Sequence, residues 1–323
     1  MLKLILTTQP FADYCQSWQE PTDAWGGIGE HPVQVLHLDH PGTVEDLAVY
    51  RPADMHDAPV LVFLHGWLAD SDDRYAFLFE RLASNGFVVV FAPYTADYDL
   101  PHEQRFEEIQ LGVSLALEHI GPAADPARMG WFGHSYGAGA IPESASRGVA
   151  QGWGSEGLLL FPMAPWYAFG EGVLPSHTVT VLQSYASDEV VDPAIAAQDI
   201  WSRLPESSLR VWQVVEDRHT SSCRAPAGHL TPGTHGGWTF IRGQRAQRID
   251  AHDVWSTARH VHAAAALAFG LPNSAEAWNV GVGVDPLDSA VQTLSSPPSS
   301  QGGYIFGPEG HCEYTPEGCP LSD

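Results

Sequence analysis

Residues 129–140 read MGWFGHSYGAGA and contain the pattern Gly133-x-Ser135-x-Gly137. The apolar residues before the pattern predict a strand, and the alanine-rich residues after it predict a helix. Side chains at positions 133 and 137 would collide with neighbouring backbone in a sharp turn, so glycine is the residue that such a turn requires there. The stretch therefore predicts a strand–turn–helix unit with a serine in strained backbone at its tip.

The same alternation of strand and helix continues on both sides of this unit. Short apolar runs such as PVLVFL (59–64) and FVVVF (87–91) are typical of strands buried on both faces of a sheet. Buried strands that alternate with helices predict an α/β fold with a mainly parallel central sheet and helices on both faces. We expect strands at 33–38, 47–50, 59–64, 87–91, 128–132, 157–161, 178–183 and 209–215, and helices at 74–83, 103–120, 138–150, 193–204 and 251–269.

Two connections refine this prediction. The strands at 33–38 and 47–50 are joined by a tight Pro-Gly turn, which predicts an antiparallel edge of the sheet. Residues 162–177 link two consecutive strands and are only 16 residues long. Because this link is short, we expect no large lid domain and an open cleft.

Composition divides the chain into three parts. Residues 1–32 are irregular but hold Trp18 and Trp25, and we expect this N-terminal segment to pack on the body. Residues 33–270 carry all the predicted elements, with no internal repeat. Residues 271–323 are rich in proline, glycine and serine, so we expect a tail that wraps on the body or is partly disordered.

The formal net charge of −24 limits the partners of the protein. Such a charge argues against nucleic acid and against an anionic membrane surface. No apolar run approaches the roughly 20 residues that a membrane span needs, and the apolar stretch 2–6 is too short for a secretion signal. We expect a monomer without a membrane span. Its compartment stays open: cytoplasmic by default, or secreted if a leader has been removed.

The four cysteines do not form a metal-binding pattern. The sequence has no CxxC and no HExxH, so it predicts neither a metal site nor a cofactor. Cys312 and Cys319 are close in sequence, and a local disulfide between them is plausible in an oxidising compartment. Cys15 and Cys223 are compatible with free thiols.

Ser135 requires a base and an acid, because a serine hydroxyl alone is a weak nucleophile. In a unit of this kind the acid and then the base follow the serine along the chain. We predict Asp188 as the acid, since it lies just past the strand at 178–183. Glu189 is less well placed, and Asp192 precedes a proline as a helix N-cap does.

Three histidines after the strand at 209–215 are candidates for the base. His219 lies four residues past the end of that strand, in the loop where the base is expected. His229 and His235 lie in a stretch rich in glycine and proline, where a surface or packing histidine is the ordinary interpretation. We therefore predict Ser135, Asp188 and His219 as the catalytic residues.

A second loop is expected beside the serine. His65, Gly66 and Trp67 directly follow the apolar run PVLVFL. In such sites an oxyanion is stabilised by the amide of the residue after the nucleophile and by an amide of this earlier loop. We predict the N–H groups of Tyr136 and Trp67 as these donors, with His65 bracing the loop.

With these residues in place, the chain resembles an α/β-hydrolase over about residues 35–270, so that 33–270 is interpreted as a catalytic domain. Within that superfamily it is similar to the cutinase-like and polyester-hydrolase group, with chlorophyllase-like and dienelactone-hydrolase-like esterases nearby. The resemblance rests on PVLVFLHGW, LASNGFVVVFAPY, GHSYGAG, MAPWYA and SDEVVDP. The 31 residues from Asp188 to His219 match the short acid-to-base interval of that group.

The resemblance also implies substrate contacts. In the polyester-hydrolase group a tryptophan of an Ala-Pro-Trp block packs on the acyl part of the substrate, and Trp166 matches it; the alternative is a core residue. Trp67, His65 and Tyr136 are expected around the same cleft. The group usually has Met after the nucleophile and Phe or Tyr after the His-Gly, where this chain has Tyr136 and Trp67. A more aromatic cleft follows, and the tail at 271–323, which has no counterpart, leaves activity on polymers open.

These observations predict a serine hydrolase that cleaves carboxylic esters through an acyl-enzyme, with cutinase-like or polyester scope as its sharper form. The substrate is expected to be a small-molecule or polymeric ester. A peptidase or acyltransferase on the same fold is the alternative within catalysis, because a triad does not fix the leaving group or the acceptor. A non-catalytic, hydrolase-like binding protein is the alternative outside it.

Overall fold

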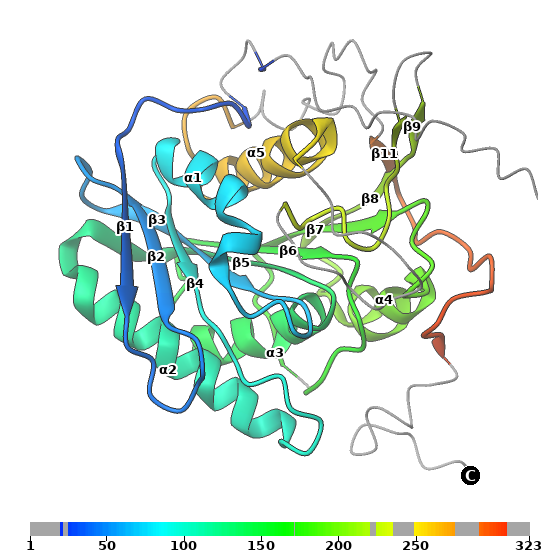
Figure 1. Cartoon of the computed structure of the whole chain (residues 1–323), viewed down its shortest axis with the longest axis horizontal. Helices are drawn as coiled ribbons and strands as arrows, with labels where there is room; N and C mark the ends of the chain where they lie inside the picture. The colour runs from blue at the N-terminus through cyan, green and yellow to red at the C-terminus, as the bar shows by residue number, and fades with distance from the viewer. Residues whose placement is uncertain are drawn as a thin grey trace, which may run out of the picture.

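A nine-stranded sheet lies between two layers of helices in the computed structural model of the chain (Figure 1). The structure describes residues 20–21, 25–170, 172–219, 224–234, 249–274 and 291–308. Within them the sheet is mixed but mostly parallel, so the predicted α/β class is confirmed at that level. The strands of the sheet are β1 (Val33–Leu38), β2 (Leu47–Pro52), β3 (Ala58–Leu64), β4 (Val88–Phe91), β5 (Ala124–His134), β6 (Gly157–Met163), β7 (Thr178–Tyr185), β8 (Leu209–Val215) and β11 (Val291–Leu294).

The strand order reverses direction at the centre of the sheet. The order is β1-β2-β4-β3-β5-β6-β7-β8-β11. Parallel pairing runs from β4 to β8, and antiparallel strands form both edges, including the predicted pair β1–β2. After β3 the chain forms β4 on one side and then β5 on the other. The loops after the neighbouring strands β3 and β5 therefore lead in opposite directions. Ligands of open α/β sheets bind at such a reversal.

Helices cover both faces of this sheet. α1 (Ala76–Ser84) and α5 (Arg259–Ala268) lie on one face, and α2 (His102–Ile120), α3 (Tyr136–Ala150) and α4 (Pro193–Asp199) lie on the other (Figure 1). Alternate side chains of each strand therefore feed two separate cores.

Strand β3 shows this division clearly. Val60 and Val62 pack into the core under α2 and α3, while Leu61 and Phe63 pack into the core under α1 and α5. All seven residues of β3 are buried. Each fully buried aliphatic or aromatic side chain contributes about 1.5–3 kcal/mol to stability, so the apolar run that was read from the sequence anchors both layers.

The last helix runs without a break over 251–268, close to the predicted 251–269, but its pitch changes within it. A π-helical segment, Asp253–Ala258, precedes α5. The side-chain amide of Gln183 in β7 donates a hydrogen bond to the Ser256 carbonyl at 2.7 Å. A side chain that binds a helix carbonyl in this way disturbs the regular ladder, which accounts for the local change of pitch.

The C-terminal tail also contributes to the sheet, which the sequence did not predict. β11 pairs antiparallel with β8, with Val291 opposite Val215 and Leu294 opposite Trp212. β11 has only four residues, VQTL, and two of them are polar and exposed. So short an edge strand produces no detectable apolar period, because one of its faces is solvated.

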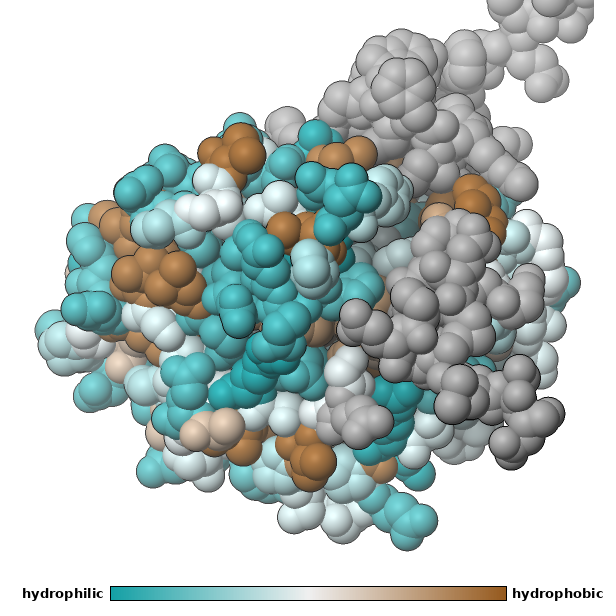
Figure 2. All heavy atoms as spheres, turned by 90° about the horizontal axis from the view of Figure 1, so that it is seen from below, coloured by the Kyte–Doolittle hydropathy of each residue, from teal (hydrophilic) through white to brown (hydrophobic). Residues whose placement is uncertain are grey.

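The surface is mainly hydrophilic on one face of the molecule (Figure 2). On the face shown in Figure 2, hydrophilic residues predominate and apolar residues form several small, separate groups. No helix in the described ranges is long and apolar enough to cross a membrane. All four cysteines, and Trp18, lie outside the described residues.

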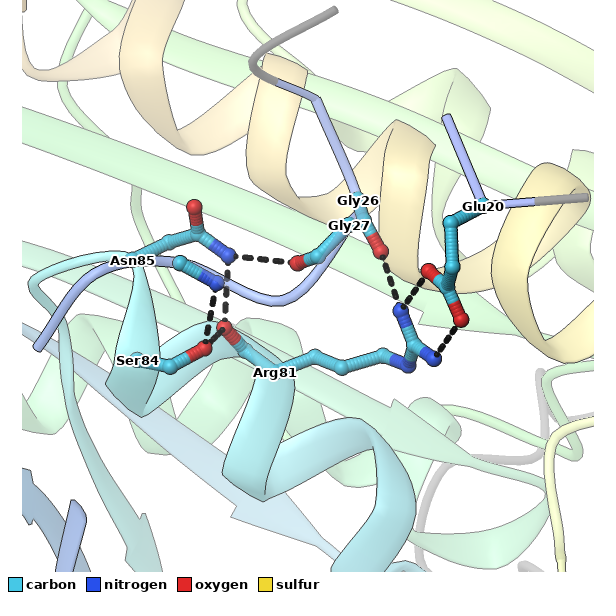
Figure 3. Close-up of polar contacts among 7 residues, drawn as sticks. Glu20, Gly26, Gly27, Arg81, Ser84 and Asn85 are labelled. Atoms are coloured by element: carbon cyan, nitrogen blue, oxygen red, sulfur yellow. Dashed lines mark hydrogen bonds and ion pairs between the residues drawn. The ribbon is translucent and has the colours of Figure 1, made fainter. Parts of the chain in front are cut away.

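Arg81 of α1 anchors the N-terminal segment (Figure 3). Its two terminal nitrogens donate to the two carboxylate oxygens of Glu20 at 2.8 and 2.7 Å, and one of them also donates to the Gly26 carbonyl at 3.1 Å. The Arg81 side chain is 5% exposed. Nearby, Trp25 packs edge-on against His262 of α5 with ring centroids 4.9 Å apart. A buried guanidinium thus ties Glu20 and Gly26 to the helical layer.

We expect Arg81→Ala to lower the free energy of unfolding by about 2 kcal/mol, because it removes the buried guanidinium that donates to the Gly26 carbonyl and to Glu20. Urea denaturation of the two proteins measures the difference. Arg147→Ala is the matched control: Arg147 pairs with Glu103 and Glu143 at a more exposed position, so its loss is expected to stay below about 1 kcal/mol. Equal losses in the two variants would contradict the anchoring role of Arg81.

Candidate active site

Ser135 lies in strained backbone at the turn between β5 and α3. Its φ is 55° and its ψ is −119°, a conformation that residues with side chains rarely adopt. The Ser135 N–H donates to the Met163 carbonyl at 3.0 Å, and its carbonyl accepts from the Trp166 N–H at 3.0 Å. The end of β6 and the loop that follows it therefore hold the strained turn from one side.

Gly133 and Gly137 hold the turn against β3 on the other side. A Cβ atom at position 137 would lie 2.2 Å from the Leu64 carbonyl oxygen and 2.4 Å from that of His65. At position 133 it would lie 2.6 Å from the Leu64 oxygen. Any side chain would collide at these distances, as predicted for both glycines.

Ser135, His229 and Asp188 form a continuous chain of hydrogen bonds. Nε2 of His229 is 2.9 Å from Oγ of Ser135, and Nδ1 is 2.9 Å from Oδ2 of Asp188. An ionised carboxylate only accepts hydrogen bonds, so Nδ1 carries the proton of the neutral ring and Nε2 is left to accept the serine proton. The His229 and Asp188 side chains are 3% and 4% exposed, so water is largely excluded from the pair.

The carboxylate of Asp188 is fixed by its own loop. Its Oδ1 accepts from the N–H groups of Val190 at 2.7 Å and Val191 at 3.2 Å. Together with His229, three donors set its orientation. Asp192 instead caps α4, accepting from the Ala194 N–H at 2.8 Å, which agrees with the interpretation from the sequence.

The predicted base His219 does not occupy the position between Ser135 and Asp188, and this assignment is corrected to His229. His219 belongs to β9 (Arg218–His219), whose backbone pairs with β10 (Arg224–Ala225); its side chain lies outside the description. This small hairpin separates the end of β8 from the loop that returns to the serine. The acid-to-base interval is therefore 41 residues, not 31, and His235 lies outside the described residues.

The carboxylate of Asp217, beside this hairpin, joins two loops. One follows β7 and leads to Asp188, and the other, residues 226–230, holds His229; we call the second the base loop. Asp217 accepts from the Ala227 N–H at 2.7 Å through one oxygen and from the Ser187 hydroxyl through the other. The Ser187 N–H also donates to the Ala227 carbonyl at 2.9 Å. Asp217 and the Gly228-His229 dipeptide are the features of the sequence that could have indicated that the chain returns to the serine. The pairing of β9 with β10 brings them close together, and it leaves no periodic pattern in the sequence.

The loop after β3 reaches the serine through Gly66. A Cβ atom at position 66 would lie 3.5 Å from the Ser135 Cβ. The loop turns tightly, with the Ala69 N–H bonded to the Gly66 carbonyl at 2.9 Å. In the described part of the chain, the N–H groups of Trp67 and Tyr136 donate no hydrogen bond. Tyr136 begins α3, where amides have no acceptor within the helix, so both predicted donors are free to bind an anion.

His65 braces this loop from the interior. Its Nδ1 donates to the Gly66 carbonyl at 2.8 Å, its Nε2 accepts from the Tyr94 N–H at 3.2 Å, and its ring stacks on Tyr94 at 3.9 Å. Burial lowers the pKa of His65 to about 4. Because the side chain is 0% exposed, the prediction that His65 contacts the substrate is wrong.

A buried pair, Tyr75 and His134, connects the loop after β3 to the base loop. The Tyr75 hydroxyl accepts from the Gly66 N–H at 3.3 Å and donates to Nδ1 of His134 at 3.1 Å. Nε2 of His134 donates to the His229 carbonyl at 2.7 Å. Burial lowers the pKa of His134 to about 3, with His229 as a smaller cause. Sequence reasoning missed this network, since neither residue stands out by spacing.

Aromatic side chains surround the turn. Trp67 and Trp166 are partly exposed, and the ring of Tyr136 lies between them, at 5.3 Å from Trp67 and 5.7 Å from Trp166. The Tyr136 side chain is 2% exposed, and its hydroxyl accepts from Arg105 at 3.0 Å. Its ring is therefore buried against Trp67 and Trp166, and a contact between Tyr136 and the substrate stays a prediction. Trp67 and Trp166 remain the aromatic surfaces near Ser135.

No model of a known protein family matches the chain, and no curated protein matches it. In the described ranges, no group of three or more His, Cys, Asp or Glu side chains could hold a metal ion.

We expect the unfolding free energy to fall as the pH falls from about 6.5 to 4, because the unfolded chain binds protons there that His134 and His65 exclude in the folded state. In His134→Gln one such group is absent, so the slope should be shallower by up to about 1.4 kcal/mol per pH unit. Urea denaturation at about pH 7, 6 and 5 measures both slopes. Asp250 and Asp253, whose pKa values are raised by burial, act oppositely but are present in both proteins. Identical slopes would contradict the lowered pKa of His134.

Proposed function

We propose that the protein is a serine hydrolase of carboxylic esters built on the α/β-hydrolase fold. The observation that carries this proposal is the hydrogen-bonded chain from Ser135 through His229 to Asp188, with both bonds at 2.9 Å. The order of the three residues along the chain and the turn after β5 support it. The mostly parallel sheet is compatible with that fold.

In the first half of the reaction, Oγ of Ser135 attacks the ester carbonyl carbon while Nε2 of His229 takes its proton. Asp188 holds the ring so that Nε2 faces the serine, and it stabilises the imidazolium that forms. The negative charge on the carbonyl oxygen is stabilised by the N–H groups of Trp67 and Tyr136. When the tetrahedral intermediate collapses, His229 protonates the leaving alkoxide and an acyl-serine remains.

In the second half, His229 takes a proton from water as the water attacks the acyl carbon. The intermediate collapses, Ser135 recovers its proton from His229, and the carboxylic acid leaves. His134 serves neither step, because its low pKa and its bond to the His229 carbonyl keep it neutral. Its contribution is to keep the base loop in place.

The surroundings of Ser135 favour an acyl group that can lie on an aromatic surface. Trp67 and Trp166 are partly exposed on either side of the Tyr136 ring. Between β6 and β7 the structure describes no helix in 164–170 or 172–177, so the link is too small to act as a lid. Cutinase-like scope, including polyesters, is the sharper form of the proposal.

Ser135→Ala and His229→Ala are each expected to lower kcat for p-nitrophenyl esters by at least about 10³-fold, because the nucleophile and its base act as one unit. His219→Ala, a substitution in the hairpin, should stay within about threefold of the parent protein. Ester turnover and labelling by a fluorophosphonate probe measure both effects. Loss of activity in His219→Ala with activity retained in His229→Ala would overturn the assignment of the base.

Asp188→Asn is expected to lower kcat by about 10³- to 10⁴-fold, since an amide can no longer hold His229 in the tautomer that accepts the serine proton. Asp192→Asn is the matched control in the same loop. It should change kcat by less than about threefold while it weakens the cap of α4 by up to about 1 kcal/mol. The two kcat values, measured on the same ester, decide the matter; equal effects would refute the role given to Asp188.

A further inference from the structure

A short part of the C-terminal tail, residues 304–307, lies along the acid loop, residues 188–192; we call it the C-terminal strap. In Figure 1 the tail leaves β11 and descends beside α4. Val191 and Phe306 form a parallel bridge. Three backbone hydrogen bonds join the two segments: Ile305 N–H to the Glu189 carbonyl at 3.1 Å, Phe306 N–H to the Val190 carbonyl at 2.8 Å, and Asp192 N–H to the Phe306 carbonyl at 3.0 Å.

The strap thereby holds the residues that hold Asp188. Val190 donates its N–H to the Asp188 carboxylate at 2.7 Å and accepts from the strap through its carbonyl. The acid loop is therefore bound from both sides. These bonds add to the burial of Val190 and Val191 in the core, and each one limits the backbone conformations open to the loop.

The strap also reaches the aromatic side chain beside the nucleophile. The rings of Phe306 and Trp166 meet edge-on, with centroids 5.5 Å apart and planes at 81°. The next residue of the strap, Gly307, accepts from the Tyr167 hydroxyl at 2.7 Å. The backbone N–H of Trp166 donates to the Ser135 carbonyl at 3.0 Å. One residue of the tail, Phe306, thus packs on the aromatic residue whose backbone binds the Ser135 carbonyl.

We propose that Phe306 is a positioning residue for the acyl subsite, and that it holds the Trp166 ring at the angle on which flat, aromatic acyl groups of esters stack. This inference rests on the proposed esterase function. Stacking requires a ring plane of fixed orientation, and Phe306 contributes the most nearly perpendicular of the ring contacts of Trp166, beside those with Tyr136, Tyr167 and Phe169. An acetyl group offers too little flat surface to depend on that angle, so the effect of Phe306 must differ between aromatic and short acyl groups.

The test compares kcat/KM for p-nitrophenyl benzoate and p-nitrophenyl acetate in the full chain and its variants. Phe306→Ala is expected to lower the benzoate-to-acetate ratio about fivefold, the size that loss of one aromatic pair allows. Phe306→Leu keeps apolar volume but removes the ring edge, so it should lower the ratio too and serves if the alanine variant does not fold. Phe306→Tyr should restore the ratio to within about twofold of the parent protein.

Ile305→Ala is the matched control, because Ile305 lies in the same strap with its side chain 40% exposed. It should leave the ratio unchanged. An unchanged ratio in Phe306→Ala or Phe306→Leu, or an equal fall of kcat/KM for both esters, would overturn the inference, since mere packing moves both substrates together. A parent protein that cleaves neither ester and takes no fluorophosphonate label at Ser135 would overturn the proposed function itself.

Discussion

The backbone of Ser135 keeps a positive φ because neighbouring segments bind it from two sides. The end of β6 and the Trp166 amide hold it on one side, and β3 lies against its two flanking glycines on the other. The strain is local, of order 1–3 kcal/mol, and the parallel pairs β3–β5 and β5–β6 offset it. Every other part of the site takes its place relative to this turn: the first amides of α3, the loop after β3, and the serine hydroxyl that His229 meets.

The loops around the turn depend on one another through neutral, buried hydrogen bonds. Tyr75 binds the Gly66 amide, His134 binds Tyr75, and the His229 carbonyl binds His134. This chain of hydrogen bonds requires an uncharged His134. A second proton, on Nδ1, would face the hydrogen that the Tyr75 hydroxyl now donates to Nδ1, so that hydroxyl would have to turn away. Burial keeps the ring uncharged. The low pKa of His134 is thus a condition for holding the oxyanion loop and the base loop in one arrangement.

The sequence predicted those parts of the site that follow from local pattern. The apolar runs predicted the strands β3, β4 and β8. The turn at Ser135 and the acid after β7 both lie where a strand ends, and the ends of parallel strands meet at one edge of the sheet. His229 could not be found this way. The hairpin of β9 and β10 inserts between β8 and the base loop, so distance along the chain no longer indicates distance from the serine. Tyr75 and His134 meet across loops from different strands, and no periodicity records such a contact.

The C-terminal tail shows the same limit of prediction from local sequence pattern, and it supports the site. Its composition indicated an irregular segment, and irregular is correct for most of 295–308. Yet backbone hydrogen bonds do not depend on side-chain pattern, so a glycine- and proline-rich segment can bind an exposed loop edge as firmly as a strand does. Residues 304–307 do so along the acid loop. The link between β6 and β7 is too short to cover the site. The residues that support its aromatic surface come instead from the C-terminal part of the sequence. There β11 already joins the tail to the sheet.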